Sequence, residues 1–456
     1  MKTFELLPTK ENLIYTYKND IIQRNAYLHR FIELLNSIDD GFSIALGGKW
    51  GSGKTFFVKQ AKMIMDVNNQ FIKEMSDEDS SLIKYTWNEY NKKHHNQLKN
   101  QVCVYYDSWK YDNDDDPLLS LIYEIANELG INYDFTEESS TAEVFISLID
   151  FLKGLNIKEL YNTMKSQKNL MEGIEKERKL TDQINTFFDS VLAERGDRLV
   201  IFIDELDRCK PSYAVNLLEK IKHYFSNERV TFVFSINNIE LINTIQKYYG
   251  QSFDSGRYLD RFFDLRLDLP PIDKENFLDY MGFKMRGVTY IQDKVVLAVV
   301  KYFGLEMREI TRFLKLIKVA VYKPAHTDPN LDNSDALCIY YIIPVMLGLK
   351  MYNTKNYYDL IQGKDCTPLI DVLSDFKNNK LFKELLKYKE TYEKLGEDMR
   401  VVKIEDKITE VYDALFNTQY TSENDYRCIG SLTFTEENKQ MIEETINLFS
   451  IYTDLN

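Results

Sequence analysis

The sequence is poor in the residues that build metal sites and disulfide frameworks. Its 456 residues include five cysteines, and these have neither C-x-x-C spacing nor any regular arrangement. The five histidines do not add a metal site, because His94 and His95 lie in a polar stretch rich in Lys and Asn and are expected to be solvated. We therefore expect a fold that is stabilised by its core, without structural zinc or disulfides.

Positive charge is also scarce. The chain has 57 Lys and Arg against 71 Asp and Glu, and its net charge of −14 disfavours non-specific attraction to nucleic acid. Small basic clusters at 92–95 and 377–380 are typical of solvated helix faces, and no nucleic-acid-binding module is present. A local basic groove would be compatible with this charge, but a nucleic acid partner is not indicated.

Long apolar runs are missing as well. The run 144–153 is broken by Asp150 and Lys153, and the run 336–349 is too short to cross a bilayer and contains Pro344. The first five residues do not resemble a signal peptide. We expect a soluble, cytoplasmic protein without membrane contact. With 44% hydrophobic and 28% charged residues, the chain has the composition of a globular protein.

Residues 48–55 fit the phosphate-binding pattern G-x-x-x-x-G-K-[ST]. The apolar run 42–46 predicts a buried strand that enters the glycines, and residues 56–61 predict a helix that leaves them, which disfavours a chance match in a surface turn. Backbone N–H groups and the helix N-terminus would face the phosphates, Lys54 would reach the β and γ oxygens, and Thr55 would ligate Mg²⁺. The predicted ATP-binding residues are Gly48, Trp50, Gly51, Ser52, Gly53, Lys54, Thr55 and Phe56.

A second motif follows a predicted central strand. Five apolar residues at 199–203 suit a parallel strand that is covered on both faces, and Asp204 and Glu205 follow directly. Asp204 is predicted to hold Mg²⁺ through water, and Glu205 to act as the catalytic residue that polarises the attacking water. An ordinary solvated acidic turn is the alternative, which the phosphate motif disfavours. Arg208 has no certain role, and Cys209 is expected to be a packing residue.

Four stretches together resemble the KAP-type P-loop NTPases, which are relatives of the AAA+ and STAND ATPases. In chain order they are residues 48–55, 104–112 with 116–119, 202–211, and 258–263 with 267–271. The resemblance covers roughly residues 15 to 320. Many KAP proteins carry transmembrane helices between the phosphate loop and the acidic strand, but this chain has none there, so it resembles a soluble bacterial-type member.

The alternation of predicted strands and helices favours an α/β fold with a parallel sheet sandwiched between helices, which is also the fold that the resemblance implies. We expect a P-loop NTPase domain over residues 1–271, with helical insertions at about 67–101 and 129–197. An all-helical lid should follow at 272–325. The Lys- and Tyr-rich remainder, 326–456, is predicted to be a helical interaction domain.

The resemblance assigns three further residues. Asn237, at the end of the strand after the acidic one, would orient the lytic water, although Asn238 could serve as well and either could be an ordinary turn residue. Arg261 resembles the arginine that reaches the γ-phosphate of a neighbouring subunit, with Arg257 as its rival. Arg308 resembles the lid arginine that contacts the nucleotide within one chain. A structural salt bridge is the alternative for each arginine.

The residues and the resemblance lead to one main hypothesis and two alternatives. The main one is Mg²⁺-dependent ATP hydrolysis coupled to homo-oligomerisation or conformational change, with protein partners from the same operon. Bacterial members of the family are associated with defence against bacteriophage, which we carry over by analogy. The first alternative is a slowly hydrolysing, nucleotide-gated scaffold that regulates a partner enzyme. The second, a small-molecule kinase, is disfavoured by the Asp204-Glu205 pair.

Overall fold

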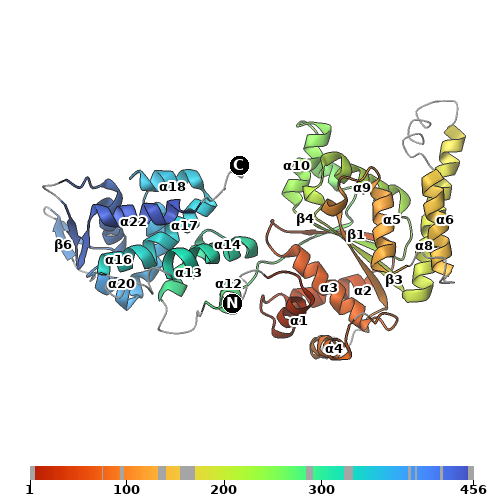
Figure 1. The fold of residues 1–456 in the computed structure, drawn as a ribbon, viewed down its shortest axis with the longest axis horizontal. Coiled ribbons are helices and arrows are strands. Elements are labelled where there is room, and N and C mark those ends of the chain that lie inside the picture. The colour runs from red at the N-terminus through yellow and green to blue at the C-terminus, as the bar shows by residue number, and fades with distance from the viewer. Residues whose placement is uncertain are drawn as a thin grey trace. The chain divides into compact units, whose positions relative to one another are not determined.

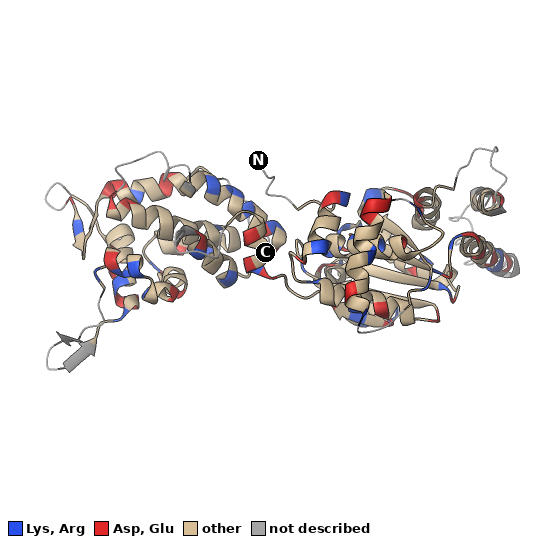
Figure 2. Ribbon diagram, turned by 90° about the horizontal axis from the view of Figure 1, so that it is seen from below, with Lys and Arg blue, Asp and Glu red and all other residues tan. Residues whose placement is uncertain are grey.

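The computed structural model describes residues 6–73, 75–92, 97–131, 140–154, 170–283, 291–322, 332–388, 392–395, 398–421 and 425–449. Two compact units are present, Leu7–Ile272 and a second that begins at Asp273. His94, His95 and the predicted boundary at 325/326 lie outside the described residues. Lys and Arg are interspersed with Asp and Glu on the helices of both units (Figure 2).

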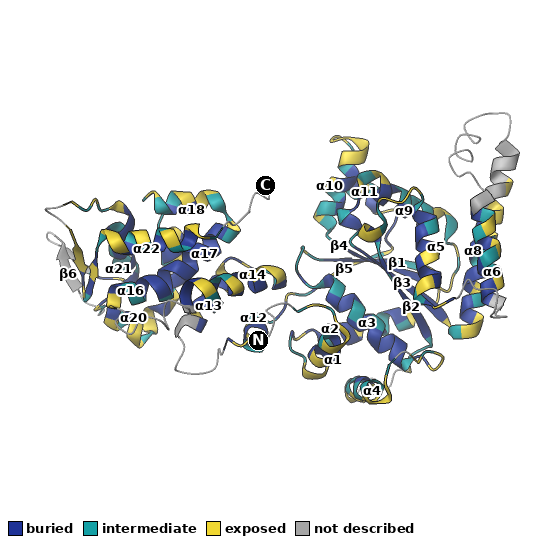
Figure 3. Ribbon diagram, viewed as in Figure 1, coloured by how far each residue is buried: buried dark blue, intermediate teal, exposed yellow. Residues whose placement is uncertain are grey.

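The first unit is built on a five-stranded sheet. Its strands are β1 Phe42–Gly47, β2 Gln101–Asp107, β3 Arg198–Asp204, β4 Val230–Ile236 and β5 Leu265–Asp268, in the spatial order β2-β3-β4-β1-β5. All four pairings are parallel. Every residue of β3 and β4 is buried, as expected for strands that are covered on both faces (Figure 3).

Helices cover both faces of this sheet (Figure 1). The helices of the unit are α1 Lys10–Asn19, α2 Asn25–Ser37, α3 Lys54–Asn68, α4 Asp77–Asn91, α5 Pro117–Glu128, α6 Ser140–Gly154, α8 Leu170–Arg195, α9 Pro211–Tyr224, α10 Asn238–Tyr249 and α11 Ser255–Leu259, with short 3-10 turns η1 Ser108–Tyr111 and η2 Leu206–Arg208. Helices α2 and α3 lie on one face, and α5 and α9 on the other. The predicted parallel sheet between helices is confirmed.

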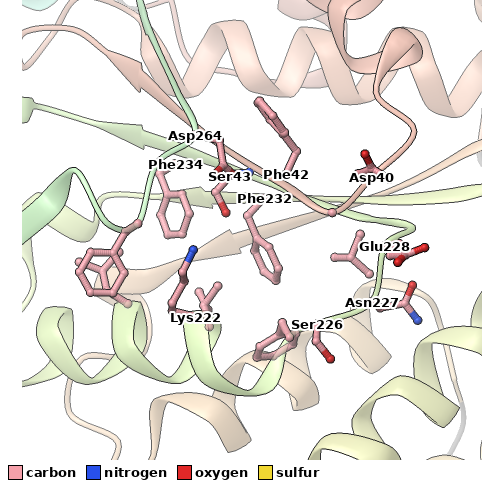
Figure 4. A pocket seen from close by; sticks show the side chains of 16 residues that line it. Asp40, Phe42, Ser43, Lys222, Ser226, Asn227, Glu228, Phe232, Phe234 and Asp264 are labelled. Atoms are coloured by element: carbon pink, nitrogen blue, oxygen red, sulfur yellow. Dashed lines mark hydrogen bonds between the residues drawn. The ribbon is translucent and has the colours of Figure 1, made fainter.

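At the edge of the sheet where the strands begin, one arginine bonds to several backbone carbonyls, and a cavity lies beside it. The Arg198 guanidinium donates to the carbonyls of Asp39, Asp40 and Glu228, at 2.6, 2.7 and 3.0 Å. A cavity of about 350 Å³ lies nearby, where the rings of Phe232 and Phe234 point from the sheet towards α9 (Figure 4). This edge is opposite to the one that carries the glycine-rich loop.

The second unit is mainly helical. Its elements are α12 Lys274–Tyr280, α13 Ile291–Tyr302, α14 Met307–Ile317, η3 Lys318–Tyr322, α16 Asn333–Leu337, η4 Cys338–Ile342, α17 Ile343–Tyr352, α18 Thr354–Ile361, α19 Thr367–Leu373, η5 Ser374–Asn378, α20 Lys380–Leu385, β6 Tyr392–Leu395, β7 Asp398–Val401, α21 Ile404–Tyr412, η6 Asp413–Asn417, β8 Arg427–Ile429, β9 Leu432–Phe434 and α22 Glu436–Asn447. Two antiparallel hairpins, β6-β7 and β8-β9, depart from the helical prediction. Their strands of three or four residues are too short to give a clear sequence pattern.

One apolar helix of this unit is longer than the sequence suggested. Elements α16, η4 and α17 run on as one helix, Asn333–Tyr352, of 20 residues with a hydropathy of 1.4, long and apolar enough to cross a membrane. The expectation that this run is too short was wrong, because Pro344 does not end the helix. The π-helical segment η4 ends at Ile342, two residues before Pro344, and changes the hydrogen-bond pattern where proline lacks an N–H. Of its most apolar window, 78% is buried inside the protein, as in a core helix.

Candidate functional site

The glycine-rich loop joins β1 to α3 at the edge where the parallel strands end. Gly51 and Gly53 have φ values of 79° and 90°, in the left-handed region that side chains disfavour. The loop is anchored at its start, because the N–H of Gly48 donates to the carbonyl of Ile236 at the end of β4, at 3.1 Å. The chain thus turns tightly from the strand into the N-terminus of α3, the geometry that suits an anion.

Lys54 is buried within this loop, with 8% of its surface exposed. Its Nζ donates to the carbonyls of Gly48, at 2.8 Å, and Lys49, at 3.2 Å. Burial lowers the pKa of the Lys54 ammonium, and the carboxylates of Asp207, Asp204 and Glu205 oppose that shift, in this order. A positive charge is therefore held among acids at the base of the loop.

A polar atom without a partner tests whether this loop fits a phosphate group. The hydroxyl oxygen of Ser52 is buried and has no hydrogen-bond partner in the part of the chain that the structure describes. A Cβ atom on Gly48 would lie 2.8 Å from this oxygen and would fill the loop. A phosphate oxygen would satisfy the Ser52 hydroxyl, so the residues present fit the nucleotide that the motif predicts.

Asp204 is the meeting point of three segments. Its Oδ2 accepts hydrogen bonds from the hydroxyl of Thr55, at 2.5 Å, and from the hydroxyl of Tyr105 on β2, at 2.9 Å. A hydroxyl and a carboxylate side by side are ligands that Mg²⁺ prefers, so Thr55 and Asp204 fit the predicted metal site. Sequence reasoning missed Tyr105, which could be found only from the parallel pairing of β2 with β3.

Glu205 follows Asp204 in a strained backbone conformation. Its φ of 59° lies in the left-handed region, which costs a non-glycine residue about 1 to 2 kcal/mol. Its carboxylate pairs with Nε of Arg208 at 2.6 Å. Burial, followed by the charge of Asp204, raises the pKa of Glu205 to about 7, while Arg208 acts in the opposite direction. A carboxylate with such a pKa can accept a proton near neutral pH, as a general base must.

Arg208, which pairs with this carboxylate, lies beside two tryptophans. The centre of the guanidinium lies 5.5 Å from the ring of Trp50, in the loop, and 5.7 Å from that of Trp109, in η1. The indole N–H of Trp50 donates to Asp207 at 2.5 Å. The motifs contain all these residues, but only the fold places Trp109 beside Arg208.

The two asparagines after β4 have different positions. The side-chain oxygen of Asn237 accepts from the N–H of Ile239, at 3.2 Å, and so caps α10. The amide nitrogen of Asn238 lies beside the end of β1, since a Cβ atom on Gly47 would be 2.5 Å from it. Asn238 therefore lies beside the start of the loop, and the role predicted for Asn237 stays a prediction.

The three predicted arginines are exposed. Arg257 lies in α11 and Arg261 directly after it, and no hydrogen bond or ion pair of the Arg261 side chain occurs among the described residues. Arg308 lies in the first turn of α14, in the second unit, so its approach to the nucleotide stays a prediction. Phe56 is 3% exposed and packs in the core behind the loop.

Arg24 is a further residue that sequence reasoning missed. It is 2% exposed and lies just before α2. Its Nη1 donates to the carbonyl of Ser52 in the loop at 2.8 Å, and its Nη2 donates to the carbonyl of Pro270. No local pattern marks a single arginine at this position, because both of its partners come from distant segments.

The parallel sheet, the glycine loop between strand and helix, and the acids that end the neighbouring strand define a P-loop NTPase. The family model described as the KAP family P-loop domain matches residues 24–322, which is more than half of the chain, and the protein belongs to this family. The resemblance seen in the sequence is thereby confirmed.

Two of the proteins that resemble this chain can be compared with it. An uncharacterized protein of Methanocaldococcus jannaschii is 28% identical over 165 residues, which cover 27% of this chain and 84% of that protein. The structure of the Aeropyrum pernix ORC2 protein, in ADPNP-ADP complexes, aligns with 93% of this chain and 94% of its own at 10% identity. Its TM-score of 0.33 is too low to support a conclusion about this protein.

Proposed function

We propose that this protein hydrolyses ATP with Mg²⁺ as cofactor. The observation that carries the proposal is the convergence of Lys54, Thr55, Asp204 and Glu205 at one edge of the sheet, with Thr55 and Asp204 in direct hydrogen bond. Membership of the KAP family supports nucleotide binding and suggests hydrolysis. Whether the nucleotide turns over is the point that an experiment must decide.

The loop and the two acids at the end of β3 have separate roles in this proposal. The loop from Gly48 to Thr55 binds the phosphates, and Lys54 releases its two carbonyl partners to hold the β and γ oxygens. Thr55 and Asp204 hold Mg²⁺, which, when bound, offsets the phosphate charge. Glu205 accepts the proton of the attacking water, for which burial has raised its pKa into the neutral range.

Assembly is the second part of the proposal. Arg261 is exposed, and an exposed guanidinium is available to a second copy of the chain, where it would stabilise charge in the transition state. Hydrolysis would then be coupled to a homo-oligomer. Arg308 would contact the nucleotide from a lid at about 272–325, and residues 326–456 would bind a protein partner encoded in the same operon, in anti-phage defence by analogy with the family.

A slowly hydrolysing switch is the alternative function, and one observation favours it. The Glu205 carboxylate is already paired with Arg208 at 2.6 Å, and a paired carboxylate is a weaker base than a free one. In this alternative the bound nucleotide would set the shape of the protein for a partner enzyme, and turnover would serve only to reset it.

Substitution of Glu205 by Gln separates these functions. For an ATPase, Glu205→Gln should reduce turnover by about a hundredfold or more and leave the affinity for Mg·ATP almost unchanged, because a general base acts on water and does not bind the ground state. Glu143→Gln, an exposed position on α6, is the matched control and should retain wild-type turnover. Equal, very slow turnover in wild type and Glu205→Gln would favour the switch.

A mixing experiment tests the role of Arg261 in assembly. Arg261→Ala protomers should bind ATP without turnover, and blending them with Lys54→Ala protomers should restore part of the activity at interfaces that pair an intact loop with an intact arginine. Turnover that does not depend on protein concentration, together with no recovery on mixing, would leave Arg261 a structural residue.

A further inference from the structure

Arg208 forms a close ion pair with Glu205. Its Nε pairs with Oε2 of Glu205 at 2.6 Å, and the two side chains are 20% and 19% exposed. The 3-10 turn η2 places residues 205 and 208 on the same side of the chain. Such a contact fixes the direction of the carboxylate.

The guanidinium itself lies over two aromatic rings from different segments. Trp50 belongs to the glycine-rich loop, and its indole N–H is tied to Asp207, which follows Glu205 by two residues. Trp109 lies on the other segment, η1 after β2, and is 53% exposed. A planar cation stacks well on indole faces, which a lysine ammonium does not match. The position of Arg208 is thus set by the two tryptophans as well as by Glu205.

This arrangement connects the phosphate loop to the carboxylate. Trp50 lies four residues before Lys54 in the loop. Because Arg208 contacts both Trp50 and Glu205, a movement of the Trp50 ring is transmitted to Glu205 through the Arg208 side chain alone. Since Trp109 is half exposed, the stack is open on one side, and the guanidinium can shift without displacing a core residue.

We infer that Arg208 is a positioning residue, which orients the Glu205 carboxylate and, through its stack with Trp50 and Trp109, makes that orientation depend on the state of the phosphate loop. The inference rests on the proposed role of Glu205 in hydrolysis. It goes further in naming what sets the direction of the carboxylate and which side chains report that a nucleotide is bound.

Tryptophan fluorescence can follow the stack without any turnover. The chain has three tryptophans, so a Trp87→Phe background leaves only Trp50 and Trp109 as emitters. Titration of this protein with Mg²⁺ and a non-hydrolysable ATP analogue should change the emission. In the Trp87→Phe/Arg208→Ala protein the part of the change that comes from Trp109, which lies outside the loop, should be lost, while calorimetry should give an affinity within about threefold of the parent.

Steady-state kinetics supply the second measurement. Arg208→Ala should lower kcat by about tenfold or more and alter KM by no more than about threefold, since the residue orients the base and does not bind the nucleotide. Arg208→Lys should restore part of kcat through its charge but not the fluorescence change, because an ammonium cannot stack as a guanidinium does. Arg208→Ala combined with Glu205→Gln should be no slower than Glu205→Gln alone.

The outcomes separate this inference from the proposed function. Full turnover in Glu205→Gln would refute the proposed role of Glu205 whatever the fluorescence shows. With that role intact, an unchanged or increased kcat in Arg208→Ala, or a change in Trp109 emission that survives in its absence, would overturn the positioning role. If Arg208→Ala fails to fold, Trp109→Leu at the exposed ring replaces it, and wild-type kcat with a wild-type change in Trp50 emission would be equally decisive.

Discussion

Each unit of the molecule buries one lysine in a similar way, and the two lysines have different meanings. Lys54 and Lys350 are both 8% exposed, and each donates to two backbone carbonyls. Burial lowers the pKa of both. The environment differs, because Lys54 faces three acids across a glycine loop, whereas Lys350 lies over the ring of Tyr357 and bonds to the carbonyls of Ile446 and Phe449, at the end of α22.

The comparison shows what makes a buried lysine part of a site. Hydrogen bonds from a lysine to backbone carbonyls serve packing equally well in either unit. Burial and hydrogen bonding therefore do not distinguish a lysine of a functional site from a structural one. What distinguishes Lys54 is a backbone that can open towards an anion and a set of acids that would be repelled by phosphate unless a metal ion lay between them. Lys350 instead lies over the ring of Tyr357.

The largest expected effect comes from the same substitution at both lysines. Lys54→Met should weaken ATP binding by about a hundredfold or more, because it removes the charge that meets the phosphates, and should also cost the first unit about 1 to 3 kcal/mol, because two carbonyls lose their donor. Lys350→Met should leave ATP binding unchanged and destabilise the second unit by about 1 to 3 kcal/mol, because two buried carbonyls lose a charged donor. Calorimetric titration and urea unfolding measure the two quantities. Similar ATP affinities in the two variants would contradict the assignment of Lys54, and not Lys350, to the nucleotide site.

Metal dependence should belong to the first unit alone. Thr55→Val removes the hydroxyl beside Asp204, so it should weaken the binding of Mg·ATP by about tenfold and that of metal-free ATP much less. Thr367→Val makes the same change at an exposed position in the second unit and serves as the control. Binding titrations with and without EDTA give both affinities. Equal losses for the two nucleotide forms would remove Thr55 from the metal site.

Acid should destabilise the first unit before the second. Burial lowers the pKa of His29 to about 4, its Nε2 is 2.8 Å from the hydroxyl of Tyr17, and its Nδ1 has no hydrogen-bond partner among the described residues. The ordinary pKa, about 6.5, applies to the unfolded chain. Stability from the neutral ring is therefore complete above pH 6.5 and is lost as the pH falls towards 4, by at most about 3 kcal/mol.

Urea unfolding between pH 8 and 4.5, followed by hydrogen exchange in each unit, measures this loss. His29→Phe should flatten the pH dependence of the first unit. Since the only histidine after residue 272 is His326, the second unit is an internal reference. A pH dependence that His29→Phe leaves unchanged would assign the acid sensitivity to other groups.

The smallest effect concerns ion pairs at different depths. The pair Lys220–Asp116 in the first unit is 18% and 17% exposed, and the pair Lys301–Glu275 in the second is 55% and 54% exposed. Asp116→Asn should cost about 1 kcal/mol, although asparagine still caps α5. Glu275→Gln should cost about 0.5 kcal/mol or less. Thermal unfolding at low and high salt measures both costs. Equal shifts of the melting temperature in the two variants would show that burial of the ion pair does not determine its contribution to stability.

The sequence by itself determined the parallel sheet between helices, the glycine loop and the acidic strand end. These features depend on residues that are close together in the chain, because a strand, its turn and the next helix are set by local spacing and apolar pattern. The same locality explains the errors. Pro344 reads as a helix breaker unless the π segment before it is known, and the short strands of the two hairpins in the second unit give no clear sequence pattern.

Only the tertiary structure decided which distant side chains complete the site. Tyr105 reaches Asp204 because β2 pairs with β3, and Trp109 reaches Arg208 because η1 follows that same strand. Arg24 reaches both the loop and Pro270 from outside the sheet. Such contacts depend on strand order, register and the rotation of packed helices, which are fixed by the burial of the whole core and therefore cannot be read from any short stretch of residues.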